Sequence, residues 1–96
     1  MIIYVDIDNT ICYTNGNDYV NSIPNFENIK KVNKLYDDGN IIIYWTGRGM
    51  KSGLDWTNLT KKQLSDWGCK YNELIMNNKP AFDLLIDDKA IKIDEL

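Results

Sequence analysis

The stretch that most constrains this chain is its opening, in which an apolar run ends in two carboxylates. Residues 2–5 read Ile-Ile-Tyr-Val, a composition typical of a buried strand, and Asp6 and Asp8 follow at once. α/β proteins place their chemistry at such strand ends. Two acids held this close repel each other unless a cation or a shared proton relieves them. The stretch therefore predicts either a functional crevice or a solvated strand end with two surface acids.

Length, charge and composition limit the fold and its partners. The 96 residues predict one domain spanning 1–96, with enough hydrophobic residues (44%) for a small core. A net charge of −3 disfavours nucleic acid as a partner. No apolar run approaches the roughly 20 residues of a membrane span, so we expect no membrane partner. The chain contains no histidine, which excludes Ser-His and Cys-His nucleophilic sites and His-rich zinc sites.

The cysteines and the start of the chain indicate where the protein works. Cys12 and Cys69 are the only two cysteines and lie far apart in the sequence. A reduced, cytoplasmic protein is the simplest interpretation of that usage. The first residues lead directly into the opening strand, so we expect no secretory signal.

Strand-like and helix-like segments alternate along the chain. Continuous apolar runs predict buried strands at 41–45, 74–76 and 84–86. Helical spacing of apolar residues predicts helices over 26–38 and 56–67, each ending at a glycine. The expected N-caps are Asn25 for the first helix and Asp55 or Ser52 for the second. Trp56 and Trp67 share the leucine stripe of the second helix, so we expect core positions for both. An Asn15-Gly16 turn predicts a small hairpin, flanked by residues 11–13 and 19–20.

This order predicts a three-layer, Rossmann-like α/β domain with a parallel sheet. We expect the opening strand near the centre, the strands at 41 and 74 successively to one side, and the strand at 84 on the other. The switch point then falls between the first and fourth strands, where ligands bind. One crevice would gather the polar groups that follow the strands: Asp6, Asp8, Thr46, Lys79, Asp87 and Asp88.

That set of groups suits phosphoryl transfer. Carboxylate oxygens are the ligands that Mg²⁺ prefers, and the ion would relieve the repulsion between the acids and attract a phosphate. Thr46 can donate to a phosphoryl oxygen, and Lys79 can neutralise its charge. Asp6 is placed to attack phosphorus and form an aspartyl-phosphate. Asp8 can protonate the leaving group and then activate water.

In these motifs the sequence resembles the haloacid dehalogenase (HAD) superfamily of Asp-dependent phosphatases. That family has an Asp-x-Asp-x-Thr motif, then a Thr or Ser after a hydrophobic strand, a Lys, and an acidic pair after a strand. The matching residues are, in family order, Asp6, Asp8 and Thr10, then Thr46, then Lys79, then Asp87 and Asp88. The match spans most of the chain. Residues 45–90 are also similar to small HAD proteins assigned as capsular-polysaccharide or sugar-phosphate phosphatases.

The resemblance implies a role for each matching residue. Asp6 would be nucleophile and Mg²⁺ ligand, and Asp8 would be acid/base and lend a backbone carbonyl to the metal. Asp87 would be the main remaining ligand, with Asp88 a ligand or in the second shell. The candidate substrate-binding residues are Asn9, Thr10, Gly47 and Arg48. Among these, Arg48 carries a planar fork suited to phosphate or carboxylate, and Asn9 stands where the family often has Gly.

The resemblance also implies how the crevice is covered and what it accepts. The chain has no room for a cap domain, and capless members of the family either take large substrates or build a lid from a neighbouring subunit. A homo-oligomer that supplies a lid is therefore one expected partner. The other is a small phosphorylated substrate, with sugar or polyol phosphates as the first class.

Three functions compete on the sequence. The first is a Mg²⁺-dependent phosphatase. The second is a receiver-like phospho-switch, but there the acidic pair precedes a lone phosphoacceptor Asp, whereas here the order is reversed. The third is a HAD-fold binding or regulatory protein that no longer turns over. All the motif residues are present, which favours the phosphatase.

Overall fold

The computed structural model describes residues 1–96 as an α/β protein built on a three-stranded parallel sheet. The strands are β1 (Ile2–Val5), β4 (Ile41–Thr46) and β5 (Glu73–Met76), in the order β1-β4-β5. β1 pairs with β4 from Ile2 opposite Ile41, and β4 pairs with β5 from Ile43 opposite Glu73. The second and third strands therefore lie to one side of the first, as the sequence predicts.

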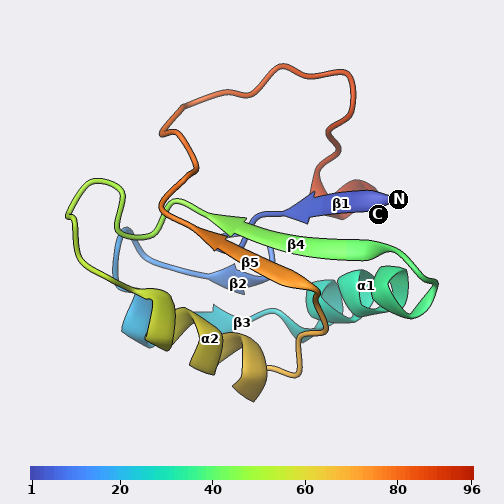
Figure 1. Ribbon diagram of the computed structural model, residues 1–96, viewed down its shortest axis with the longest axis horizontal. Coiled ribbons are helices and arrows are strands. Elements are labelled where there is room, and N and C mark those ends of the chain that lie inside the picture. The colour runs from blue at the N-terminus through green and yellow to red at the C-terminus, as the bar shows by residue number, and fades with distance from the viewer.

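Two helices cover one face of this sheet (Figure 1). They are α1 (Phe26–Asp37) and α2 (Thr57–Asp66), and their buried residues share a core with Ile42 and Tyr44 of β4. Because side chains alternate along a strand, these two β4 residues point to the same face. The opposite face carries Tyr4 and Trp45, whose rings pack edge to face with centroids 5.7 Å apart. The sheet thus has one helical layer, and the predicted three-layer arrangement is wrong.

The predicted fourth strand is also absent. Leu84 and Ile86 are 75% and 89% exposed, and residues 77–92 contain no helix or strand. In Figure 1 this segment forms a wide loop over the uncovered face before the chain returns to β1. An edge strand of three residues gains few backbone hydrogen bonds, while ordering each residue costs about 1–2 kcal/mol of backbone entropy. Without this strand β1 lies at the edge of the sheet, not near its centre, and no switch point forms.

The helix boundaries follow the local sequence. Asn25 is the N-cap of α1, since its side-chain oxygen accepts a hydrogen bond of 3.1 Å from the backbone of Asn28. The N-cap of α2 is Trp56, without a side-chain cap bond, so the prediction of Asp55 or Ser52 as the cap is wrong. Asp55, one residue earlier, still accepts a 2.9 Å hydrogen bond from the backbone of Thr57 at the start of the helix. Gly39 and Gly68 follow the two helices with positive φ, as helix-ending glycines do.

Three details differ from the sequence predictions. Phe26 of α1 is exposed rather than part of the apolar face. Trp67 packs against the core, but Trp56 packs edge to face on Tyr19 outside it, with centroids 5.2 Å apart. The residues flanking Asn15-Gly16 do not pair with each other. Instead β2 (Cys12–Tyr13) pairs antiparallel with β3 (Ile23–Pro24), and a 3-10 turn, η1 (Tyr19–Asn21), lies between them.

The chain ends in a second 3-10 turn, η2 (Ile93–Glu95), whose Ile93 packs against the core. Both chain ends therefore lie near β1, as Figure 1 shows. Neither α1 nor α2 combines the length and the apolar character that crossing a membrane would require.

Candidate active site

Asp6 and Lys79 form an ion pair at the carboxyl end of the sheet. Lys79 Nζ lies 2.8 Å from Asp6 Oδ1, and the same oxygen accepts a 2.9 Å hydrogen bond from the backbone of Ile7. The Asp6 side chain is 41% exposed, and its Oδ2 accepts no hydrogen bond from the protein. The sequence prediction that these two residues meet is therefore confirmed, and one carboxylate oxygen faces solvent without a partner.

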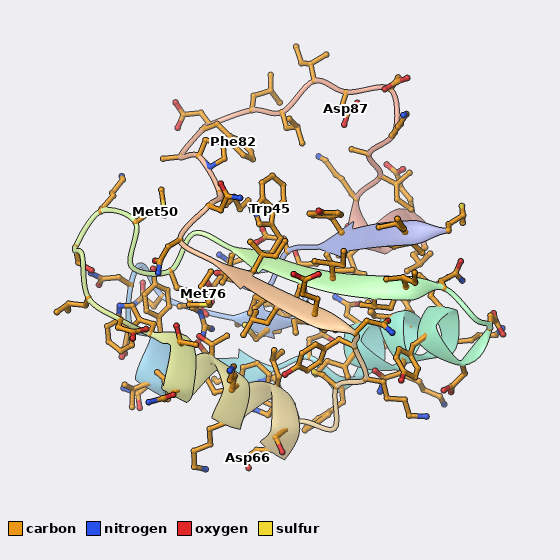
Figure 2. The ribbon with its side chains drawn as sticks, viewed as in Figure 1. Trp45, Met50, Asp66, Met76, Phe82 and Asp87 are labelled. Carbon is orange, nitrogen blue, oxygen red and sulfur yellow. The ribbon has the colours of Figure 1, made fainter.

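Aromatic rings hold the Lys79 ammonium in place. The Nζ atom lies 5.5 Å from the ring centroid of Trp45 and 5.6 Å from that of Phe82, distances at which a cation is attracted to a ring face. Figure 2 shows Trp45 rising from the uncovered face of the sheet toward Phe82 on the segment after β5. The Lys79 side chain is consequently only 14% exposed. The ammonium is therefore positioned by Asp6 and by two aromatic rings.

Asp8, two residues further on, has a different environment. Arg48 Nη2 donates to Asp8 Oδ1 at 2.8 Å, and Arg48 Nε donates to Asp8 Oδ2 at 3.0 Å. The Thr14 hydroxyl also donates to Oδ1, at 2.6 Å. A two-pronged Arg–carboxylate pair of this kind is strong and directional. Asp8 is thus fixed in one orientation, with a lone pair of Oδ2 left over.

Arg48 is buried, which corrects its predicted role in substrate binding. Its side chain has no exposed area, whereas that of Asp8 is 22% exposed. Arg48 Nη1 donates to Gln63 at 2.6 Å and to Thr60 at 3.1 Å, both on α2. Its Cζ atom lies 4.8 Å from the Tyr19 ring centroid. With every guanidinium nitrogen engaged inside the protein, none is left for a ligand in this arrangement.

The turns after β1 and β4 give the remaining predicted residues their places. Asn9 has a φ of +61°, which Asn tolerates better than most residues, and its side chain accepts from the backbone of Thr14 at 3.3 Å. The carbonyl of Thr10 accepts from the side chain of Asn28 on α1, so Thr10 is tied to the helix. Thr46 is buried, and its hydroxyl oxygen accepts from the backbone of Arg48 at 3.2 Å. The Thr46 hydroxyl hydrogen remains free to donate.

The two glycines of the loop after β4 have different roles. A Cβ at Gly47 would lie in ordinary contact with Lys79, 3.7 Å from its backbone oxygen. Gly49 has a φ of +87°, and a Cβ there would collide with the backbone oxygen of Leu54. Gly47 therefore lies beside the backbone of Lys79, and its role in substrate binding stays a prediction. Gly49 is required by the packing of the loop on itself.

Asp87 and Asp88 are not part of this site. Both are exposed, and Figure 2 shows Asp87 high on the loop over the uncovered face. Hydrogen bonding to Asp88 lowers the pKa of Asp87, with a smaller contribution from the backbone of Lys89. The structure contains no cluster of three or more acidic, Cys or His side chains able to hold a metal ion. As arranged here, Asp6, Asp8, Asp87 and Asp88 do not form a Mg²⁺ site, because the second pair lies on a segment that makes no strand.

Sequence reasoning missed the residues that surround Asp8. Thr14 bonds to Asp8 and, at 2.7 Å, to Ser22, while Gln63 donates to the backbone oxygen of Tyr19 at 2.6 Å. A buried Gln on the apolar stripe of α2 was the one available signal, because a buried polar side chain needs a partner. Cys12 also lies beside Asp8, but burial raises the pKa of its thiol, so it remains protonated and is no nucleophile.

Comparison with known proteins supports the fold alone. The structure is similar to the crystal structure of an MCSG target from Vibrio cholerae, with a TM-score of 0.87 and 22% sequence identity, over 98% of this chain and 85% of that one. No protein-family model and no curated protein matches the sequence.

Proposed function

We propose that this chain is a phosphomonoester hydrolase of the HAD type, which works through an aspartyl-phosphate on a small phosphorylated metabolite. The supporting observation is the contrast between its two neighbouring carboxylates. Asp6 is half-exposed, has a free oxygen and is paired with Lys79, whereas Asp8 is held in a fixed orientation by Arg48. Two acids whose environments differ in this way are suited to different roles in one reaction.

The geometry suggests how the groups would divide the work. Asp8 first takes up a proton from solvent on Oδ2, which accepts only from Arg48 Nε. Asp6 Oδ2 then attacks phosphorus while the ester P–O bond breaks, and the leaving oxygen takes that proton from Asp8. Asp8 then removes a proton from water, which attacks the aspartyl-phosphate, releases phosphate and restores Asp6. Lys79 turns from Asp6 to the phosphoryl oxygens, and the Thr46 hydroxyl donates to one of them.

The Mg²⁺ requirement of this family stays a proposal of its own. No step above passes through the ion, because Asp87 and Asp88 do not reach Asp6 in this arrangement. Loss of hydrolysis in excess chelator, restored by Mg²⁺, would support it. Full turnover in chelator would remove the ion from the mechanism.

Sugar or polyol phosphates, of the kind consumed in capsular-polysaccharide synthesis, are the first substrate class to test. We also propose a cytoplasmic location, in keeping with two free thiols, and a homo-oligomer in which a neighbouring subunit covers the crevice. A panel of phosphorylated metabolites, measured with and without Mg²⁺, tests the substrate class. Molecular mass in solution tests the oligomer.

One observation favours a second candidate function. The acidic pair that the resemblance assigns to the metal lies outside the site, so a HAD-fold binding or regulatory protein is the alternative. Such a protein would bind phosphorylated compounds without releasing phosphate. The receiver-like switch has no observation in its favour.

The deciding experiment compares two carboxylates. Asp6→Asn should leave essentially no phosphatase activity, because an amide is a poor nucleophile. Asp8→Asn should lower the rate by about 10² to 10⁴ and accumulate a phosphoryl adduct on Asp6, visible in the intact mass. The control is Asp66→Asn, at an exposed ion pair on α2. Wild-type turnover in Asp6→Asn would exclude the aspartyl-phosphate, and binding without turnover in the native protein would favour the alternative.

A further inference from the structure

Arg48 is a buried cation, and Asp8 is the one acid with which it forms an ion pair. A charged side chain without exposed area is retained only where partners compensate for the lost water. Here Asp8 supplies the negative charge, and Gln63 and Thr60 accept the remaining hydrogen bonds. The guanidinium is planar and its hydrogens point in fixed directions, so this arrangement determines its plane.

The plane of the guanidinium in turn determines that of the Asp8 carboxylate. Two parallel hydrogen bonds, of 2.8 and 3.0 Å, prevent the carboxylate from rotating about its last torsion. Oδ1 is further occupied by the Thr14 hydroxyl at 2.6 Å, whereas Oδ2 accepts only from Arg48 Nε. Oδ2 is therefore the oxygen with a lone pair available for a proton.

We propose that Arg48 is a positioning residue that aims Oδ2 of Asp8 at the leaving group and at the attacking water. This inference rests on the proposed phosphatase function, and it replaces a substrate contact with a contact to the acid/base. Thr14 assists by occupying the other oxygen. Proton transfer depends steeply on the placement of the donor, so disturbing the fork slows the steps in which Asp8 moves a proton.

The same contacts couple the acid to the segment between β2 and β3. Gln63 accepts from Arg48 and donates to the backbone oxygen of Tyr19, whose ring lies against the guanidinium. A displacement of that segment would therefore reach Asp8 through a short chain of hydrogen bonds. Arg48 links the position of the loop to the position of the acid.

The test uses Arg48→Lys, which keeps the charge and removes the fork. The kcat/KM values are measured for phenyl phosphate, whose leaving group needs a proton, and for 4-nitrophenyl phosphate, whose leaving group does not. The loss should be at least about tenfold greater for phenyl phosphate, because only that reaction uses Asp8 before the leaving group departs. The ratio of the two losses, taken on one preparation, does not depend on the fraction of protein that is folded.

Two further variants fix the interpretation. Thr14→Val should shift the ratio in the same direction by a smaller factor, and Arg48→Lys in an Asp8→Asn background should not shift it at all. Lys62→Met, at an exposed ion pair on the same helix as Gln63, is the control and should leave both rates unchanged. Equal losses for the two esters, or a shift that persists without Asp8, would overturn the positioning role. A native protein that hydrolyses neither ester would instead refute the phosphatase function on which it rests.

Discussion

Two acidic pairs in this chain follow similar apolar runs in the sequence but have different environments in the structure. Asp6 and Asp8 follow the apolar run of β1, and Asp87 and Asp88 follow Leu84-Leu85-Ile86. The first pair lies at the edge of a sheet, paired with Lys79 and Arg48, whereas the second is exposed on a segment without strand or helix. An apolar run followed by acids is therefore insufficient to build a site.

The two apolar runs differ in the strand that is available for backbone pairing. Ile2–Val5 pairs with the six-residue strand β4 and buries Val5 in the core. The run at 84–86 could pair through at most three residues, and it pairs with neither edge strand of the sheet, β1 or β5. Long-range pairing and a buried face convert the first run into a strand, and the second has neither.

The largest expected difference between the regions is in the stability cost of losing one acid. Asp8→Asn leaves the guanidinium of Arg48 buried with an amide in place of a carboxylate, and should lower the free energy of unfolding by about 3 kcal/mol. Asp87→Asn, the same change at an exposed position, should leave the urea midpoint unchanged. Urea unfolding followed by Trp fluorescence measures both. Equal losses of stability in the two variants would contradict the difference in environment between Asp8 and Asp87.

A smaller difference in stability is expected when two isoleucines, one in each region, are shortened to valine. Ile42 is completely buried in β4, so removing one methyl group through Ile42→Val should cost about 1 kcal/mol. Ile86 is 89% exposed, and Ile86→Val should leave the urea midpoint where it is. A clear loss of stability in Ile86→Val would mean that residues 84–86 are packed in solution, as a fourth strand would be.

The smallest expected effect is on the pH dependence of stability, and it concerns two aspartates that accept a hydrogen bond from the backbone two residues further on. Asp55 accepts from the backbone of Thr57 at 2.9 Å and Asp87 from that of Lys89 at 3.3 Å, and the pKa of each is lowered, mainly by hydrogen bonds to Thr57 and to Asp88 respectively. A lowered pKa adds stability that is present above about pH 4 and is lost as the pH falls through the folded-state value. Because Asp55 holds the start of α2, Asp55→Ala should flatten the acid side of the stability curve slightly. Asp87→Ala should not change it, because Asp87 and Asp88 are neighbours on a segment without helix or strand and can interact in the same way in the unfolded chain. Urea midpoints between pH 2 and 7 measure both variants.

Local signals in the sequence account for the elements that formed as predicted. The Asn25 cap, the glycines after the helices and the apolar run of β4 each depend on neighbours in the chain, and each is confirmed. The proximity of Asp6 and Lys79 also followed from the sequence, since both residues lie just beyond parallel strands that end at one edge, but the ion pair between them was not predicted.

Features that depend on residues far apart in the sequence could not be predicted from the sequence pattern. The guanidinium of Arg48 could bind either a phosphate or a carboxylate. Only the fold shows that it is paired with the carboxylate of Asp8. Thr14 and Gln63 contribute to the site through hydrogen bonds that span six and fifteen residues. The run at 84–86 has the composition of a strand, but composition does not show whether a partner edge compensates for its entropy.

The loop over the uncovered face has a consequence for how the molecule exchanges its amide protons. Residues 80–91 make no backbone–backbone hydrogen bond, whereas β4 is bonded to a strand on each side. In deuterated water the amides of that loop therefore exchange almost as fast as in an unfolded peptide, while those of Ile42 and Tyr44 wait for the sheet to open. Any ligand or ion that draws Asp87 toward Asp6 would be detected as slowed exchange confined to this one segment, whether or not a reaction takes place.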